Sequence, residues 1–491
     1  MKHLVWALLA AAALSACTLM PHYHRPQSPV ADRWPADAGD ANAAAAPGVS
    51  ADQIGWRDFF TDPRLERLIE IALENNRNLR IAVLNVAASE AQFRVERGNL
   101  FPAISASGSG LVERLPANGA IPLGGNTGSN TSPKVPSGPE ATTFHFYTAG
   151  IGFTNYELDL FGRERSLTTA AFEQYLAQSE SRRSAQISLV AEVATDYFSV
   201  LADEALVNVT LETLQSETES YQLTMAMYEH DTTTLLSLRQ AESAVEAARA
   251  NLAQYQRQLA QDTHALTLVL GEEIPADLPP ARDLNSEGLL APVPAGLPSG
   301  LLTHRPDILS AEHTLRSANA DIGAARAAFF PSIQLTASGG TASGRLKGLF
   351  GAGSGTWSFA PTITLPIFTG GQNVANLDLA HIEKKIGVAQ YELAIQTAFR
   401  EVSDALSARG TYIDQRRAEE ALVGADADAY RLAQMRFRSG VDNYLATLDA
   451  QRSLYAAQQG LVTVRQAELT NQVTLYKALG GGWQERTASI Q

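Results

Sequence analysis

The stretch TWSFAPTITLPIF, residues 356–368, alternates at most of its positions between small polar and large apolar side chains. The polar positions are Thr356, Ser358, Thr362 and Thr364, and the apolar positions are Trp357, Phe359, Ile363, Leu365 and Ile367. A period of two is typical of a β-strand, because successive side chains of a strand point to opposite faces. Such a strand fits either a half-buried soluble sheet or a barrel wall between lipid and water.

Three other segments carry the same alternation, and together they indicate that the sequence contains an internal two-fold repeat. They are SASGS at 105–109, YTAGIGFT at 147–154 and SIQLTAS at 332–338. Two β-hairpins are therefore predicted, at about 102–160 and about 331–368. NLFPAISASG at 99–108 matches AFFPSIQLTA at 328–337, and ELDLFGRER at 157–165 matches TLPIFTGGQ at 364–372. The repeat period is about 210 to 230 residues. Repeat 1 is expected over 56–285 and repeat 2 over 300–483, followed by a tail at 484–491.

Long helices are predicted between and around the hairpins. Residues 163–228 contain neither proline nor glycine, and 373–437 behave alike apart from three glycines. At 1.5 Å per residue, each helix would be roughly 100 Å long. Shorter helices are predicted at about 62–100, 233–270, 304–329 and 442–479. Helices of this length require supercoiled neighbours, because an isolated amphipathic helix cannot bury its apolar face.

The amino terminus has the features of an export signal. Residues 1–16 combine Lys2 and His3 with an apolar run and small residues, and Cys17 follows as the only cysteine of the chain. Leu-Ser-Ala-Cys at 14–17 resembles the bacterial lipobox, in which the leader is removed and the cysteine is acylated. The resemblance implies a signal peptide at 1–16 and a lipid-anchored linker at 17–55, although an ordinary secretory signal remains the alternative. Thr18, rather than aspartate, implies sorting to the outer membrane.

Composition excludes several classes of function. The 38 Lys plus Arg against 52 Asp plus Glu give a net charge of −14, which disfavours nucleic acid as a partner. No HExxH, GxSxG or complete phosphate-loop motif occurs, so no enzyme and no cofactor are expected, apart from covalent lipid on Cys17. His22 and His24 are expected to be solvated linker residues rather than metal ligands.

Four strands cannot close a barrel, and open sheet edges are not tolerated in lipid. Two chains would give about eight strands around a filled interior, whereas three would give about twelve around a pore. Small inward residues such as Gly150, Gly152, Ser332 and Thr336 favour the wet pore. The predicted fold is therefore an α+β membrane protein with a trimeric 12-stranded β-barrel, four strands per chain, continuous with a long α-helical barrel.

These motifs resemble those of the outer-membrane factor family. The resemblance rests on the lipobox, the paired halves, FFPSI, ELDLFGR, RFRSGVDNYLATLDAQRSLY and the ending LYKALGGGW. It covers nearly all of the mature chain and points to the OprM-like lipoprotein branch of the TolC-type exit ducts. It implies a homotrimer in the outer membrane, with a large periplasmic part, a periplasmic adaptor and an inner-membrane RND transporter. Such a duct is passive and conducts drugs or other small toxic molecules outward.

The resemblance also implies particular gate residues. Leu445 and Asp449 match the constricted periplasmic tip of the OprM-like branch, and their spacing of four places them on one helix face. Arg436 and Glu229 match residues that help to hold this end closed. Here Phe437 replaces the usual tyrosine and Asp231 replaces the turn glycine. The repeat places Leu236 and Gln240 opposite the gate residues, so only one belt would be charged.

Two other functions remain open on the sequence alone. A periplasmic coiled-coil structural lipoprotein without a pore would have the same helix content, but it would not need twice-repeated alternating hairpins. A lipoprotein enzyme would need a nucleophile and base, or a set of metal ligands, and the sequence offers neither.

Overall fold

The computed structural model describes residues 18–31, 33–34, 51–115, 141–284, 286, 290–291, 293, 300 and 303–487. Cys17, the signal peptide at 1–16 and much of the linker lie outside these residues. The described residues form two compact units. The sheet unit takes them from Met1–Pro26, Ala87–Ala177 and Glu312–Ala389, and the helical unit from Gln27–Val86, Gln178–Ala311 and Gln390–Gln491. Both units therefore combine residues from both halves of the chain.

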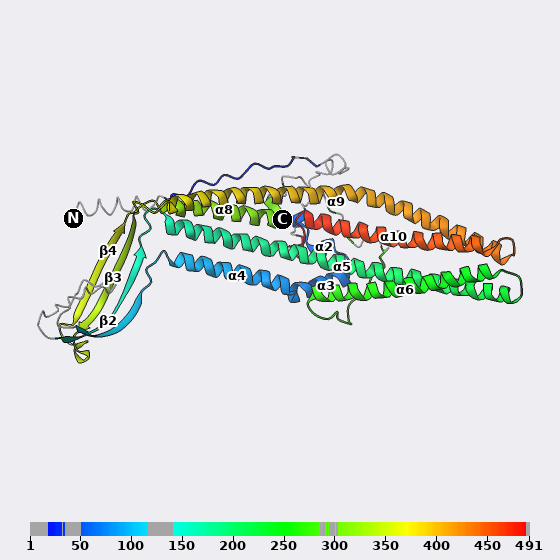
Figure 1. Ribbon diagram of the computed structural model, residues 1–491. Helices are drawn as coiled ribbons and strands as arrows, with labels where there is room; N and C mark the ends of the chain where they lie inside the picture. Colours follow the sequence, from blue (N-terminus) through cyan, green and yellow to red (C-terminus); the bar gives the residue numbers. More distant parts are fainter. Residues whose placement is uncertain are drawn as a thin grey trace. The chain divides into compact units, whose positions relative to one another are not determined.

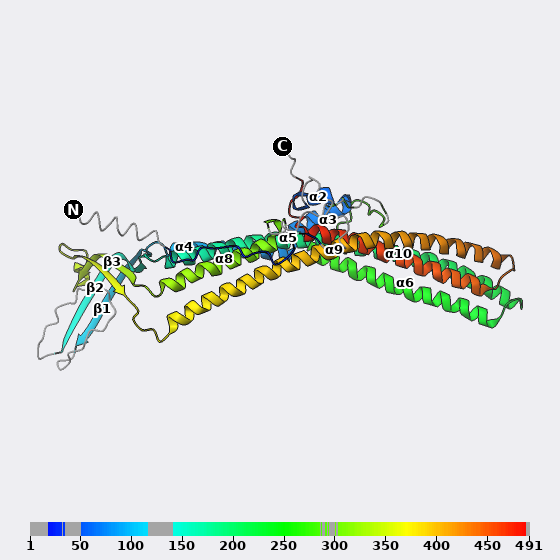
Figure 2. The same cartoon turned by 90° about the horizontal axis from the view of Figure 1, so that it is seen from above.

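An antiparallel four-stranded sheet dominates the sheet unit (Figures 1 and 2). Its strands are β1 (Ser105–Leu115), β2 (Thr142–Glu157), β3 (Ser332–Ser343) and β4 (Gly355–Thr364). The strand order is β1-β2-β3-β4, so each predicted hairpin forms and β2 pairs with β3 between them. Within the described residues, β1 and β4 are thus the two edges of the sheet.

The two faces of the sheet differ in chemistry as the alternation predicts. Cross-strand hydroxyl pairs join Ser109 Oγ to Thr148 Oγ1 at 2.7 Å and Ser338 Oγ to Ser358 Oγ at 2.8 Å. The opposite face carries large apolar side chains, and Trp357 is 79% exposed. An exposed aromatic surface of this kind is costly in water, so this face needs lipid or another cover.

A β-bulge interrupts β2, which the alternation did not indicate. The register with β3 shifts between Phe153 and Tyr156, and Asn155 adopts a left-handed conformation with φ 55°. The Asn155 N–H donates to Thr336 Oγ1 at 3.3 Å. Asparagine tolerates this conformation better than most residues, which explains why it occupies the bulge.

Helices make up most of the rest of the chain. They are α2 (Trp56–Phe59), α3 (Pro63–Asn75), α4 (Arg77–Gly98), α5 (Arg163–Glu229), α6 (Leu235–Leu270), α8 (Pro306–Ala327), α9 (Gln372–Arg438) and α10 (Tyr444–Ala478), with 3-10 turns η2 (Ala51–Gln53) and η3 (Leu346–Gly348). Both α5 and α9 have 67 residues, so the predicted long helices are present. In the helical unit, α6 runs beside α5 and α10 beside α9 (Figures 1 and 2). No helix in the described part of the chain has both the length and the hydropathy needed to cross a membrane.

The prediction of one continuous helix over 62–100 is wrong, because the chain breaks at Asn76. This residue is extended, with φ −62° and ψ 128°. Its side-chain oxygen accepts from the N–H of Leu79 at 2.9 Å, and its amide group donates to the carbonyl of Val269 at 2.7 Å. Asn76 therefore caps α4 and also joins it to the end of α6.

The first described residues, 18–26, lie along α8 within the sheet unit. The Arg25 guanidinium pairs with the buried carboxylate of Glu312 at 2.5 Å, and Asn319 donates to the carbonyl of Pro21 at 2.8 Å. Thr18 lies directly against Gly162, because a Cβ added to Gly162 would lie 2.8 Å from the Cα of Thr18. The segment just after Cys17 is therefore held at the turn from β2 to α5.

Candidate functional site

Two helical hairpin turns, at α5–α6 and α9–α10, end the helical unit at the predicted gate. In the first, Asp231 has φ 56° and the Thr232 N–H donates to the carbonyl of Met227 at 2.8 Å. In the second, Gly440 has φ 70° and the Val441 N–H donates to the carbonyl of Arg436 at 2.9 Å. Asp231 thus takes the left-handed conformation that glycine takes in the other turn.

Leu445 and Asp449 lie in the first turns of α10 and share an exposed face. Leu445 is 44% exposed, and Asp449 is also exposed. The neighbouring Tyr444 and Leu448 are buried instead and pack with Ala241 of α6. Leu445 is therefore not a core residue of the single chain, and its side chain is free to meet another surface.

Arg436 and Glu229 occupy matching ends of α9 and α5, but their partners differ. Arg436 forms a two-pronged ion pair with Asp442, with Nη2–Oδ1 at 2.9 Å. Through this hydrogen-bonded pair the guanidinium holds the pKa of Asp442 below its usual range. Glu229 is exposed, and its carboxylate forms no hydrogen bond or ion pair with the described residues. Sequence reasoning missed Asp442, which lies six residues after Arg436 across the turn.

The matching positions of the α5–α6 turn are an exposed leucine and a half-buried glutamine. Leu236 is 68% exposed, and Gln240 occupies the place that Asp449 has in α10. Both helix starts therefore present an exposed leucine, and only α10 adds a carboxylate one turn further along.

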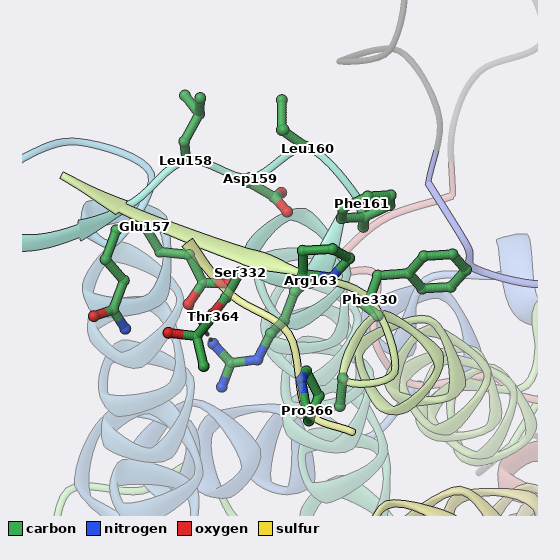
Figure 3. Close-up of a pocket in the computed structure, with 14 residues that line it drawn as sticks. Glu157, Leu158, Asp159, Leu160, Phe161, Arg163, Phe330, Ser332, Thr364 and Pro366 are labelled. Atoms are coloured by element: carbon green, nitrogen blue, oxygen red, sulfur yellow. Dashed lines mark hydrogen bonds and ion pairs between the residues drawn. The ribbon is translucent and has the colours of Figure 1, made fainter. Parts of the chain in front are cut away.

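A second feature is a cavity of 340 Å³ at the turn between β2 and α5, within the sheet unit (Figure 3). Asp159 accepts hydrogen bonds at Oδ2 from the backbone N–H of Arg165 at 3.0 Å and from its Nε at 3.1 Å, which caps the start of α5. Arg163 bridges Glu157 at 3.1 Å and Glu164 at 2.8 Å.

The same cavity explains two of the sequence motifs. The rings of Phe161, in ELDLFGR, and Phe330, in FFPSI, stack at a centroid distance of 4.7 Å. Figure 3 shows Leu158 and Leu160 pointing to the side opposite Arg163. The two motifs therefore form one strand-to-helix junction, with an aromatic contact between the two halves of the chain.

No group of three or more His, Cys, Asp or Glu side chains in the described part of the chain is arranged to hold a metal ion. What the geometry offers is a sheet with one small polar face, paired helical hairpins and an exposed leucine and carboxylate at their turns.

Comparison with known proteins finds similar sequences over almost the whole chain. The family model for the outer membrane efflux protein matches residues 68–272 and 297–481. The toluene efflux pump outer membrane protein TtgC of Pseudomonas putida is 49% identical over 99% of this chain and 97% of its own length. The outer membrane protein OprJ of Pseudomonas aeruginosa is 43% identical over 98% and 96%.

A solved structure shows the same architecture. The open-state MtrE outer membrane channel of Neisseria gonorrhoeae superposes with a TM-score of 0.85 at 39% identity, covering 96% of this chain and all of that one. Together with the sheet, the paired long helices and the hairpin turns, these matches settle the family. The chain belongs to the outer membrane efflux protein family.

Proposed function

We propose that three copies of this chain form a passive exit duct, with one twelve-stranded β-barrel in the outer membrane and one α-helical barrel in the periplasm. The observation that carries the proposal is the four-stranded sheet, whose edges β1 and β4 lack further strand partners among the described residues. Its small polar face fits a wet pore, and its exposed apolar face fits lipid. Closure by three copies removes both edges.

The duct works with other proteins in this proposal, because nothing in the sequence supplies energy for transport. A periplasmic adaptor would join it to an inner-membrane RND transporter. Its cargo would be small and largely apolar, since similar proteins carry the names of toluene and antibiotic efflux pumps. Crosslinking in intact cells, followed by purification of this chain, should capture an adaptor and a transporter. Capture of neither, from cells that export such compounds through this chain, would contradict the assignment.

A periplasmic structural lipoprotein without a pore is the second candidate, favoured only by the high helix content. A structural lipoprotein of this kind does not explain why the ring of Trp357 is 79% exposed. It also offers no explanation for the hydroxyl pairs across the opposite face of the sheet.

Cys17 is proposed as the lipid anchor, supported by the position of Thr18 at the turn from β2 to α5, next to the sheet. The mature protein is expected to begin at an acylated Cys17, and Cys17→Ala is expected to lose both processing and lipid. The barrel should still insert, because twelve strands contact lipid independently of the anchor. Intact-mass spectrometry measures this directly, and a retained leader or an unmodified Cys17 would contradict it.

Leu445 and Asp449 are proposed as the gate. Three-fold symmetry would turn each into a ring, about 6 Å apart along the helix axis. The leucine ring can close the pore by excluding water, and the carboxylate ring favours cations. In single-channel recordings, Leu445→Ala is expected to raise the conductance of the closed state severalfold, and Asp449→Ala to reduce cation selectivity. Leu236→Ala is the matched control at the other turn, and a similar effect there would contradict the assignment.

Arg436 and Glu229 are proposed to help to hold the closed gate. The Arg436–Asp442 pair supports this, because it fixes the turn immediately before α10. The same recordings on charge-reversed Arg436→Glu and Glu229→Lys should show a larger closed-state conductance. Unchanged conductance in both variants would remove these residues from the gate.

A further inference from the structure

The first turn of α10 has a weaker local attachment than the matching turn of α6. At the start of α6, Thr234 Oγ1 accepts a hydrogen bond from the Ser237 N–H at 3.2 Å and so caps the helix. At the start of α10, the side chain of Asn443 makes no capping hydrogen bond within the described chain. The helix that carries Leu445 and Asp449 must therefore be positioned by something other than its own cap.

Tyr444, the first residue of α10, supplies this attachment. Its ring is buried with Ala241 and Ala244 of α6 and lies 5.6 Å from the ring of Phe437 of α9. Its hydroxyl donates to Oε2 of Glu217, on α5, at 3.3 Å. One side chain, adjacent to Leu445, thus contacts all three other helices at this end of the unit.

Glu217 is an unusual residue for this position. It is 3% exposed, although a carboxylate is costly to bury without a full set of partners. Burial raises the pKa of Glu217 to about 7, while the Tyr444 hydroxyl and the charge of Arg452 act in the opposite direction. Its carboxyl therefore changes charge near neutral pH.

Few other titratable or charged groups of the described residues face Glu217. From α10 they are Tyr444 and Arg452, and from α9 Tyr430, whose hydroxyl pairs with Ser216 Oγ at 2.7 Å. On the α6 side the cluster consists of Ala241 and Ala244. Burial raises the pKa of the Tyr444 hydroxyl, so it stays protonated and remains a donor.

We infer that Glu217 is a positioning residue of the gate, which acts through Tyr444 to hold the first turn of α10, and with it Leu445 and Asp449, in the closed arrangement. This rests on the proposed function, because it requires these two residues to form the constriction. The neutral carboxyl is compatible with burial, whereas the charged carboxylate favours any arrangement that exposes it to water.

The direction of the pH effect follows from this difference. The pKa of an exposed glutamate is about 4.3, well below the pKa of the buried Glu217. The closed arrangement therefore binds the proton more tightly, so it gains stability as the pH falls through 7 and loses it as the pH rises. Ionisation of Glu217 at pH 8 should release the start of α10, and protonation at pH 5.5 should retain it.

The test is the open probability of reconstituted channels at pH 8, 7 and 5.5, measured in an Asp449→Asn background so that the carboxylate ring does not contribute. With Glu217 present, open probability should fall at least about tenfold between pH 8 and pH 5.5, since each pH unit below the pKa changes the balance up to about tenfold. Glu217→Gln keeps the acceptor without charge and should stay mostly closed throughout. The matched control Glu219→Gln, at an exposed position two residues away, should keep the pH response.

Tyr444→Phe is the second variant, and it also decides the matter if Glu217→Gln fails to assemble. It keeps the buried ring but removes the donor to the carboxylate, so the midpoint of the pH response should move to higher pH. A pH response unchanged by both variants would overturn the inference. Failure of the proposed gate itself would give a different result, because Leu445→Ala would then also leave the closed-state conductance unchanged.

Discussion

Replacement of Gly340 by valine is expected to abolish the assembled channel. Gly340 pairs with Gly150 at the centre of the contact between β2 and β3. A Cβ at this position would lie 2.3 Å from the carbonyl oxygen of Ala149 and 2.5 Å from Cα of Gly150, and both are backbone atoms. The strands would have to separate, which breaks the one pairing that joins the two hairpins in the described part of the chain.

Gly339→Val is the matched control for this experiment. A Cβ on Gly339 meets nothing within 4 Å, and the residue pairs with Ile151 and Trp357 on the apolar face. Valine there should be accepted, because it adds apolar surface where lipid is expected. The yield of heat-resistant trimer in outer-membrane fractions measures both variants. Equal yields of the two variants would contradict the close backbone approach of β2 and β3 at Gly340.

Tyr476→Ala is expected to destabilise the helical unit by about 3 to 5 kcal/mol, the usual cost of removing a large buried aromatic side chain. Tyr476 is 2% exposed, and its ring stacks on Phe59 at 4.0 Å. Its hydroxyl donates to the carbonyl of Ile54 at 2.6 Å. Gly481 approaches the same ring so closely that a Cβ would lie 2.1 Å from a ring carbon. The packing of this one ring thus explains the tyrosine and the second of the three consecutive glycines in the LYKALGGGW ending.

Thermal unfolding followed by circular dichroism in detergent measures this effect. Tyr476→Phe should lose only about 1 kcal/mol, because it retains the ring and gives up one hydrogen bond. Tyr228→Ala removes a tyrosine that is 39% exposed, and it should change stability by less than about 0.5 kcal/mol. If Tyr476→Ala melts at the same temperature as the unmodified protein, this packing does not stabilise the unit.

The parts of the fold that could be predicted are those fixed by local patterns. Helix α5 extends over Arg163–Glu229, within one residue of the prediction, because no proline or glycine interrupts that run. The strands follow from alternation, which a pleated chain requires whenever its two faces meet different surroundings. The family followed from motifs that proved to pack together, such as Phe161 against Phe330.

The parts that could not be predicted depend on contacts distant in sequence. Asn76 breaks a helical run because it finds the carbonyl of Val269 almost two hundred residues away. Asn155 forms a bulge whose partner, Thr336, lies in the other half of the chain. Nothing in the residues around Glu217 indicates that Tyr444 would bury it. The gate residues were named from resemblance, and a single chain shows only that Leu445 and Asp449 are exposed and share a face.

The central claim is that this chain forms a conducting pore, and current through a planar lipid bilayer tests it most directly. Purified protein of trimeric mass should insert in discrete steps and carry a small, cation-selective current. Leu445→Ala should increase the current in each step. Trimers that insert stably in the bilayer but carry no current, either unmodified or with Leu445→Ala, would contradict the account and leave a structural lipoprotein in its place.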